Sequence, residues 1–155
     1  MAYESYADNF EKEIKKRMNE NMSEVVDTYQ NKLKAKLDTP PSRTGRIYYI
    51  HPYGRHQASR GENPTGEGNE PPAPLSRGLI NSIKKVKSVD SNLVFHGSVY
   101  SNLDRALYLE LGTGMRFTKS GDSRGQIHPR PAWVKTLVEN RDELGDIATQ
   151  GFKRG

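Results

Sequence analysis

The sequence contains no cysteine. It therefore has no disulfide framework, no thiolate ligand for zinc and no cysteine nucleophile. Long apolar runs are also missing, because no segment approaches the roughly 20 consecutive apolar residues that span a bilayer. We therefore expect no membrane partner. The first stretch, MAYESYADNFEKEIKKRMNE, is charged throughout and lacks the apolar region of a signal peptide.

Apolar residues are scarce, at 33% of the 155 residues. A chain of this length can form one domain with a core of its own, but this core must be small. The net charge of +5 is too modest to indicate wholesale disorder, and it permits contact with a polyanion. We predict a single domain over residues 1–155, with a small core and polar arms that become ordered when copies or partners assemble around them.

Catalytic motifs are missing as well. Gly112-Thr113-Gly114 follows a predicted helix, whereas the glycines of a phosphate-binding loop precede one. No G-x-S-x-G sequence occurs, so a serine nucleophile at a strand-to-helix turn is not indicated. The four histidines include no closely spaced pair on a helix, which a cysteine-free zinc site would need. We therefore expect no enzymatic activity, no catalytic residue, no cofactor and no metal.

Residues 1–38 are predicted to form one long helix. Apolar residues recur there at steps of three or four, which places them on one helical face. Thr39-Pro40-Pro41 ends the helix, because proline disfavours helical geometry in the residue before it. A small core cannot cover so long a helix, so we expect one end to project or a neighbouring subunit to cover part of the apolar face. The alternative is a helix lying across its own sheet. The predicted apolar face consists of Tyr3, Tyr6, Phe10, Ile14, Met18, Met22, Val25, Tyr29, Leu33 and Leu37.

Residues 40–75 are predicted to form a long loop or arm, because seven of the nine prolines lie there and connections of this length are usually functional or disordered. Its first half has no acidic residue and interleaves arginines with tyrosines, and Arg46 to Ile50 is predicted to form a short strand or hairpin. This composition suits contact with nucleic-acid phosphates and equally suits docking on an acidic protein surface. The candidate residues are Arg43, Arg46, Arg55, His56 and Arg60.

Residues 76–145 are predicted to hold the α+β core and the closing helix. LINSIKKVKSV begins apolar and becomes amphipathic, and NLVFHGSVY has the pattern of a strand that buries Val94, Phe95 and Val99. NLDRALYLELG indicates a short helix capped by Asn102 or Asp104 and ended by Gly112. PAWVKTLVENRDEL indicates a closing helix, with Pro131 in its first turn. Its predicted inner face consists of Trp133, Val134, Leu137 and Val138.

Five short motifs follow one another along residues 43–140. They are His56-Gln57-Ala58-Ser59, Glu70-Pro71-Pro72-Ala73, Gly78-Leu79-Ile80-Asn81-Ser82-Ile83, Tyr108-Leu109-Glu110-Leu111-Gly112-Thr113 and Arg130-Pro131-Ala132-Trp133. In this order they resemble the HK97 gp10-like family of neck and tail-completion proteins of tailed bacteriophages. The chain departs from the family pattern by a glycine-rich insert at residues 61–69 and by Ser76-Arg77 before the third motif, where the family has threonine.

The resemblance implies a small antiparallel sheet flanked by helices, similar to tail terminators, and assembly as a ring of six copies. It further implies that Tyr108, Leu109 and Leu111 bury against the closing helix, and that residues 112–114 release the chain into a loop facing a neighbouring subunit. Glu110 would pair with a basic group such as Arg130, either within the chain or across the ring. The implied interface residues are Tyr108, Leu109, Glu110, Leu111, Gly112, Thr113, Arg130 and Trp133.

The function implied by the resemblance is that of a structural virion protein, a tail-completion component that joins head to tail. We expect it in the virion neck, and in the host cytoplasm during assembly, with other neck and tail-tube proteins as partners. Its basic arm would make non-specific contact with packaged DNA in the channel. A tail terminator or head-closure protein of the same neck is the first alternative. A small basic nucleic-acid-binding protein is the second.

Overall fold

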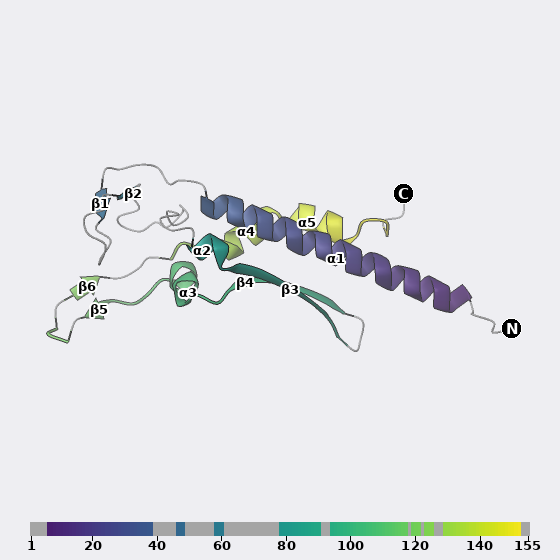
Figure 1. Ribbon diagram of the computed structural model, residues 1–155, viewed down its shortest axis with the longest axis horizontal. Helices are drawn as coiled ribbons and strands as arrows, with labels where there is room; N and C mark the ends of the chain where they lie inside the picture. Colours follow the sequence, from purple (N-terminus) through teal and green to yellow (C-terminus); the bar gives the residue numbers. More distant parts are fainter. Residues whose placement is uncertain are drawn as a thin grey trace. The chain divides into compact units, whose positions relative to one another are not determined.

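The structure, a computed structural model, describes residues 6–38, 46–48, 58–60, 78–90, 94–117, 119–121, 123–125 and 129–152. It has the predicted α+β class: a long N-terminal helix, an antiparallel hairpin, short helices and a C-terminal helix packed against the long one (Figure 1). In chain order the elements are α1 (Tyr6–Asp38), β1 (Arg46–Tyr48), β2 (Ala58–Arg60), α2 (Gly78–Asn81), β3 (Ile83–Val89), β4 (Phe95–Ser101), α3 (Asp104–Leu111), β5 (Arg116–Phe117), β6 (Ser123–Gly125), α4 (Trp133–Glu139) and α5 (Arg141–Ala148).

The chain divides into two compact units. The first comprises Met1–Asn31, Lys84–Tyr100 and Leu137–Gly155, and the second comprises Lys32–Ile83 and Ser101–Thr136. The first unit thus holds most of α1, most of the β3–β4 hairpin and α5. The second holds the end of α1, the β1–β2 pair, α3 and the beginning of α4. The single domain over residues 1–155 stays a prediction.

Helix α1 confirms the predicted N-terminal helix from Tyr6 to Asp38. Its buried apolar residues are Val26, Leu33 and Leu37. The predicted apolar face is therefore used along the later turns, with Val26 more deeply buried than the predicted Val25. Near the beginning of the helix, Tyr6 is 96% exposed and Phe10 is 68% exposed. Of the helices that the structure describes, none has both the length and the apolar character to cross a membrane.

The β3–β4 hairpin is the longest pair of strands in the described residues. Its turn is closed by two hydrogen bonds: the Asp90 N–H donates to the Val94 carbonyl at 3.1 Å, and the Val94 N–H donates to Asp90 Oδ1 at 2.9 Å. The strand predicted within residues 92–100 is confirmed as β4, with Phe95 and Val99 half-buried. The burial predicted for Val94 is wrong, because Val94 lies at the turn and is exposed.

One face of the hairpin lies against α1 (Figure 1). A Cβ on Gly97 would collide with Val26 Cγ2 and would come within 2.9 Å of Met22 Sδ. Glycine at this position thus permits a backbone approach that a side chain would block. Lys85 of β3 forms an ion pair with Asp27 of α1. The hairpin is therefore fixed to α1 by a close backbone contact and by one pair of opposite charges.

Helix α5 is fixed to α1 by a polar contact at its C-terminal end. Asn21 Nδ2 donates to the carbonyl of Ala148 at 3.2 Å and to that of Gln150 at 3.0 Å, and Arg17 Nη1 donates to the carbonyl of Gly151 at 3.3 Å. The last carbonyls of a helix have no partner within it, so Asn21 satisfies groups that would otherwise need water. We call this contact the Asn21 clamp.

The closing helix predicted from residue 131 is two helices, because Asn140 interrupts it at φ −113° and ψ 14°. The prediction for its inner face is also wrong. Ala132 and Thr136 are buried, whereas three larger residues are exposed: Val134, Leu137 and Val138. Small side chains at positions four apart share one helical face and allow close packing there. The larger apolar residues then point outward.

The remaining strands form short pairs, so the described strands make three separate two-stranded sheets instead of the single predicted sheet. The strand or hairpin predicted for Arg46 to Ile50 is found as β1 over Arg46–Tyr48, which pairs antiparallel with β2, and residues 49 and 50 lie outside the described residues. Strands β5 and β6 also pair antiparallel, with an irregular register between Arg116 and Phe117. Gly121 supplies the positive φ of 88° between these two strands, a conformation that glycine adopts without steric cost.

Candidate functional site

The candidate site is the junction of α3 with the beginning of α4, in the second unit. Helix α3 ends at Gly112, as predicted, where a φ of 75° turns the chain and the Gly112 N–H donates to the Tyr108 carbonyl. The predicted N-caps are wrong. The capping position is Leu103, which makes no side-chain cap, and its N–H is bound by Ser101 Oγ at 3.2 Å.

Glu110 connects α3 to α4. Its Oε2 accepts hydrogen bonds from the N–H groups of Ala132 at 2.8 Å and Trp133 at 3.1 Å, and its Oε1 accepts one from the Val134 N–H at 2.9 Å. The first N–H groups of a helix have no internal acceptor, and a negative charge is favoured at this end of the helix dipole. One carboxylate therefore satisfies three groups. We call this contact the Glu110 clamp.

The Glu110 clamp gives this carboxylate backbone partners that the sequence did not indicate. We predicted that Glu110 is left to pair with a basic group such as Arg130, whereas the contacts described for its carboxylate are those three backbone N–H groups. Arg130 is nevertheless close, because its own N–H donates to the Leu109 carbonyl. An ion pair between Glu110 and Arg130 stays a prediction.

The burial expected for α3 is wrong. The residue that it buries is Ala106, whereas Leu107 is 58% and Leu111 is 68% exposed, and Tyr108 is also exposed. Ala106 and Glu110 are four residues apart and share one face, which is the face that carries the clamp to α4. Leu107 and Leu111 share another face, which is open to solvent.

Val134 extends the exposed apolar surface beyond α3. Its N–H is bound by Glu110, the neighbour of Leu111 in sequence, while its side chain is 58% exposed. The clamp thus holds Val134 near the end of α3. We call Leu107, Leu111 and Val134 together the α3 surface. Among the predicted interface residues, Leu109, Gly112, Thr113, Arg130 and Trp133 are half-buried.

The basic candidate residues of the arm, for contact with DNA or with an acidic protein surface, are described in part. Arg43, Arg55 and His56 lie outside the described residues. Arg46 and Arg60 lie on β1 and β2, and the antiparallel register pairs them directly with each other. The structure therefore brings together two members of the predicted set that are distant in sequence.

Sequence reasoning missed two polar contacts and one glycine. Asn21 interrupts the apolar face of α1 between Met18 and Val25. A polar residue on such a face indicates a side chain that makes hydrogen bonds in a buried place. Gly97 lies inside a strand pattern, a position that often marks a close backbone approach. The hydroxyls of Ser82 and Ser101 hydrogen-bond to each other at 2.6 Å, and the sequence carries no pattern that indicates this pair.

The described residues include no group of three or more histidine or acidic side chains placed to hold a metal ion. The chemistry that the site offers is that of a surface, with exposed apolar side chains on a hydrogen-bonded support. Comparisons of the chain with protein-family models, with curated proteins and with solved structures gave no match.

Proposed function

We propose that this protein is a structural component of a tailed-bacteriophage virion, a tail-completion protein that forms a ring of six copies at the head–tail junction. The observation that carries the proposal is the α3 surface. Large apolar side chains are exposed there, on helices that the Glu110 clamp holds together. Exposed apolar side chains that gather on one surface mark sites of protein association.

The resemblance to the gp10-like family supports the same proposal. Its Glu-x-Gly-Thr motif includes Glu110, and its Arg-Pro motif leads into Ala132 and Trp133, which are two of the groups that Glu110 binds. The two motifs thus meet in one contact. A motif that builds a surface for assembly fits a structural protein better than an enzyme. A tail terminator or head-closure protein would use such a surface in the same way.

The first experiment is the mass of the full chain by light scattering over a range of concentrations, with and without purified tail tubes. We expect the mass to rise with concentration toward six copies and the chain to be captured on tube ends. A chain that stays monomeric and ignores tubes, but binds DNA with a steep dependence on salt, would overturn the proposal in favour of a small nucleic-acid-binding protein.

A pair of variants locates the contact. Leu111→Asp places a charge on the α3 surface, and Val86→Asp is the matched control, because Val86 is also an exposed apolar residue, on β3. We expect Leu111→Asp to abolish the rise in mass and Val86→Asp to retain it. The opposite result would move the subunit contact from α3 to the β3–β4 hairpin.

A further inference from the structure

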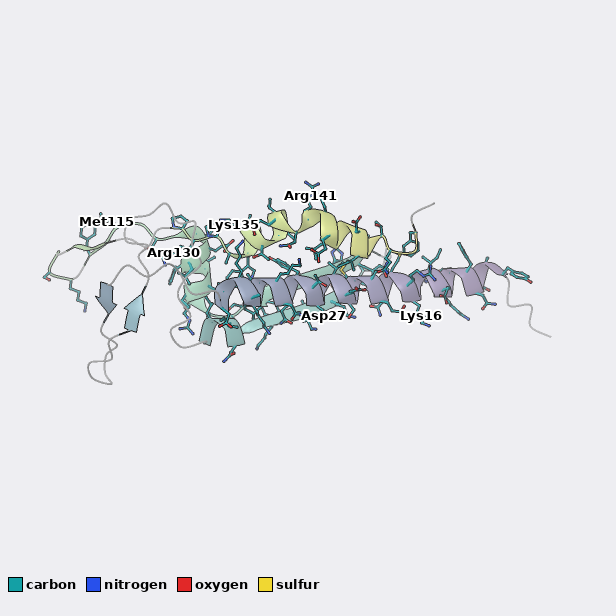
Figure 2. All side chains as sticks on the ribbon, turned by 90° about the horizontal axis from the view of Figure 1, so that it is seen from above. Lys16, Asp27, Met115, Arg130, Lys135 and Arg141 are labelled. Atoms are coloured by element: carbon teal, nitrogen blue, oxygen red, sulfur yellow. The ribbon has the colours of Figure 1, made fainter. Side chains whose placement is uncertain are left out.

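Two large apolar side chains follow α3 and remain exposed in the single chain. Met115 is 56% exposed (Figure 2), and Phe117 of β5 is 62% exposed. A Cβ added to Gly114 or to Gly121 would meet no other described atom within 4 Å, so the segment is open both before and after β5. Lys119, in the turn after β5, is exposed as well. We call Met115, Phe117 and Lys119 together the β5 arm.

The two apolar side chains of the β5 arm have nearly the spacing of the two leucines on α3. Residues two apart in an extended strand lie on one face and advance about 6.8 Å. Leu107 and Leu111 share one helical face and advance about 6 Å along the helix axis. Met115 and Phe117 therefore match both leucines of the α3 surface at once. All four side chains are exposed in the single chain, so the match is one between copies.

Charge gives this match a direction. Asp104 precedes Leu107 by three residues on the same helical face and is exposed. Lys119 follows Phe117 by two residues on the β5 arm. A negative charge thus lies beyond one end of the leucine pair, and a positive charge lies beyond one end of the apolar pair on the arm. These opposite charges meet only when the arm runs antiparallel to α3.

We propose that the β5 arm of one copy docks on the α3 surface of the next copy. The pairs across the contact are Met115 with Leu111, Phe117 with Leu107, and Lys119 with Asp104. The arm and the surface are different parts of the chain, so each copy donates one and receives one. Contacts of this heterologous kind close into a ring when the rotation between copies allows it. The inference rests on the proposed function for the ring, and it names the partner of the α3 surface.

The first test places a charge on the arm. The variant is Phe117→Asp, and Phe10→Asp is the matched control, because Phe10 is a similarly exposed phenylalanine on α1. Light scattering of the full chains measures the concentration at which the mass rises, and circular dichroism checks that each variant is folded. We expect Phe117→Asp to raise that concentration at least about tenfold and Phe10→Asp to raise it much less. Equal effects of the two variants would overturn the proposal.

The second test exchanges the two charges. Asp104→Lys and Lys119→Asp each place like charges across the contact, and we expect each to weaken association about two- to fivefold, as for an exposed pair. The chain that carries both substitutions should regain most of the loss. Asp104→Lys also removes a favourable charge from the first turn of α3. The double variant carries that same cost, so its recovery reports on the contact alone, and losses that add in it would overturn the proposal.

Mixing two defective chains separates the arm from the surface that it binds. A Phe117→Asp copy retains the α3 surface, and a Leu111→Asp copy retains the β5 arm. Each alone should stay monomeric at a concentration where the wild-type chain assembles. An equal mixture should form dimers, because one intact contact remains between unlike copies. A mixture that stays monomeric, or a Phe117→Asp chain that assembles normally, would overturn the proposal.

Capture on tail tubes distinguishes failure of this proposal from failure of the proposed function. If the wild-type chain is captured on tubes but the two variants do not pair, this proposal fails and the proposed function stands. If the variants pair but the wild-type chain is not captured on tubes, the proposed function fails and the contact between copies stands.

Discussion

Two helix ends in this molecule are each held by one side chain from another helix. One of these side chains donates hydrogen bonds and the other accepts them. At the C-terminal end of α5, the amide of Asn21 donates to carbonyls. At the N-terminal end of α4, the carboxylate of Glu110 accepts from N–H groups. Each side chain has the chemistry that its helix end lacks, because a helix exposes unpaired acceptors at one end and unpaired donors at the other.

The surroundings of the two clamps differ. Asn21 is 8% exposed, and the first unit that contains it also buries Val26 and Leu144. Glu110 is half-buried, and the neighbouring Leu111 and Val134 are exposed. The same kind of contact therefore completes an interior in one region and supports an open apolar surface in the other. The difference separates residues that stabilise the fold from residues that stay exposed on the surface.

Replacing one leucine in each region gives the largest expected contrast. Leu144→Ala removes a buried side chain of α5 and leaves a cavity, so we expect it to lower the free energy of unfolding by about 2 to 5 kcal/mol. Leu111→Ala removes an exposed side chain, and we expect a change within about 0.5 kcal/mol. Urea unfolding followed by circular dichroism measures both. Equal losses would show that α3 is covered in the free chain and would remove the contrast.

A substitution of equal size tests the polarity of the Asn21 clamp. Asn21→Asp turns a donor into an acceptor that faces two carbonyl oxygens in a nearly buried place, so we expect it to cost about 2 kcal/mol. Asn21→Ala should cost about 1 kcal/mol. The control is Asn19→Asp, at an exposed position of the same helix. If Asn21→Asp unfolds at the same denaturant concentration as the wild-type chain, the clamp contributes nothing to the free energy of unfolding.

The Glu110 clamp is tested by removing first the charge and then the acceptors. We expect Glu110→Ala to cost about 1 to 2 kcal/mol, in the range of lost helix caps. Glu110→Gln should cost about 1 kcal/mol or less, because one oxygen remains but the favourable interaction with the helix dipole is lost. Glu20→Ala, at an exposed position of α1, is the control. The same denaturant series measures all three, and a Glu110→Ala midpoint equal to that of the control would contradict the account.

The smallest effect is expected at a pair of exposed charges on α1. A hydrogen bond from Lys15, together with its charge, holds the pKa of the Glu11 carboxyl below its ordinary value of 4.5. Because the folded pKa is the lower one, the stabilisation is present above the unfolded pKa and is lost as the pH falls through the folded pKa.

An NMR titration of the Glu11 carboxyl checks this interaction. We expect Lys15→Ala to raise the pKa toward 4.5 and Lys16→Ala, on the same helix (Figure 2), to change it less. A Glu11 pKa that is the same in all three chains would mean that the ion pair does not persist in solution, which is common for exposed pairs.

Much of the fold could be predicted from local sequence pattern. Which faces of α3 and α4 point to the interior could not. The helical form of α1 and the stop at Gly112 depend on neighbours within a few residues, and both predictions are confirmed. The inner face of α3 was implied by the family resemblance and that of α4 was predicted from apolar residues on one helical face, and both expectations are wrong for most of the residues named. There the small residues Ala106, Ala132 and Thr136 are buried, because helices in close contact favour short side chains, and this contact is not visible in either segment alone.

The sequence by itself determined the α+β class, the end of α1 at Asp38, the β4 strand and the presence of an arginine-rich segment without acidic residues. These follow from periodicity, turn residues and charge, which act over short distances along the chain. Only the tertiary structure decided that Asn21 closes α5, that Glu110 closes α4, that Leu111 faces solvent and that Arg46 lies opposite Arg60. Each of these depends on which backbone groups or strands, distant in sequence, are brought within hydrogen-bonding distance.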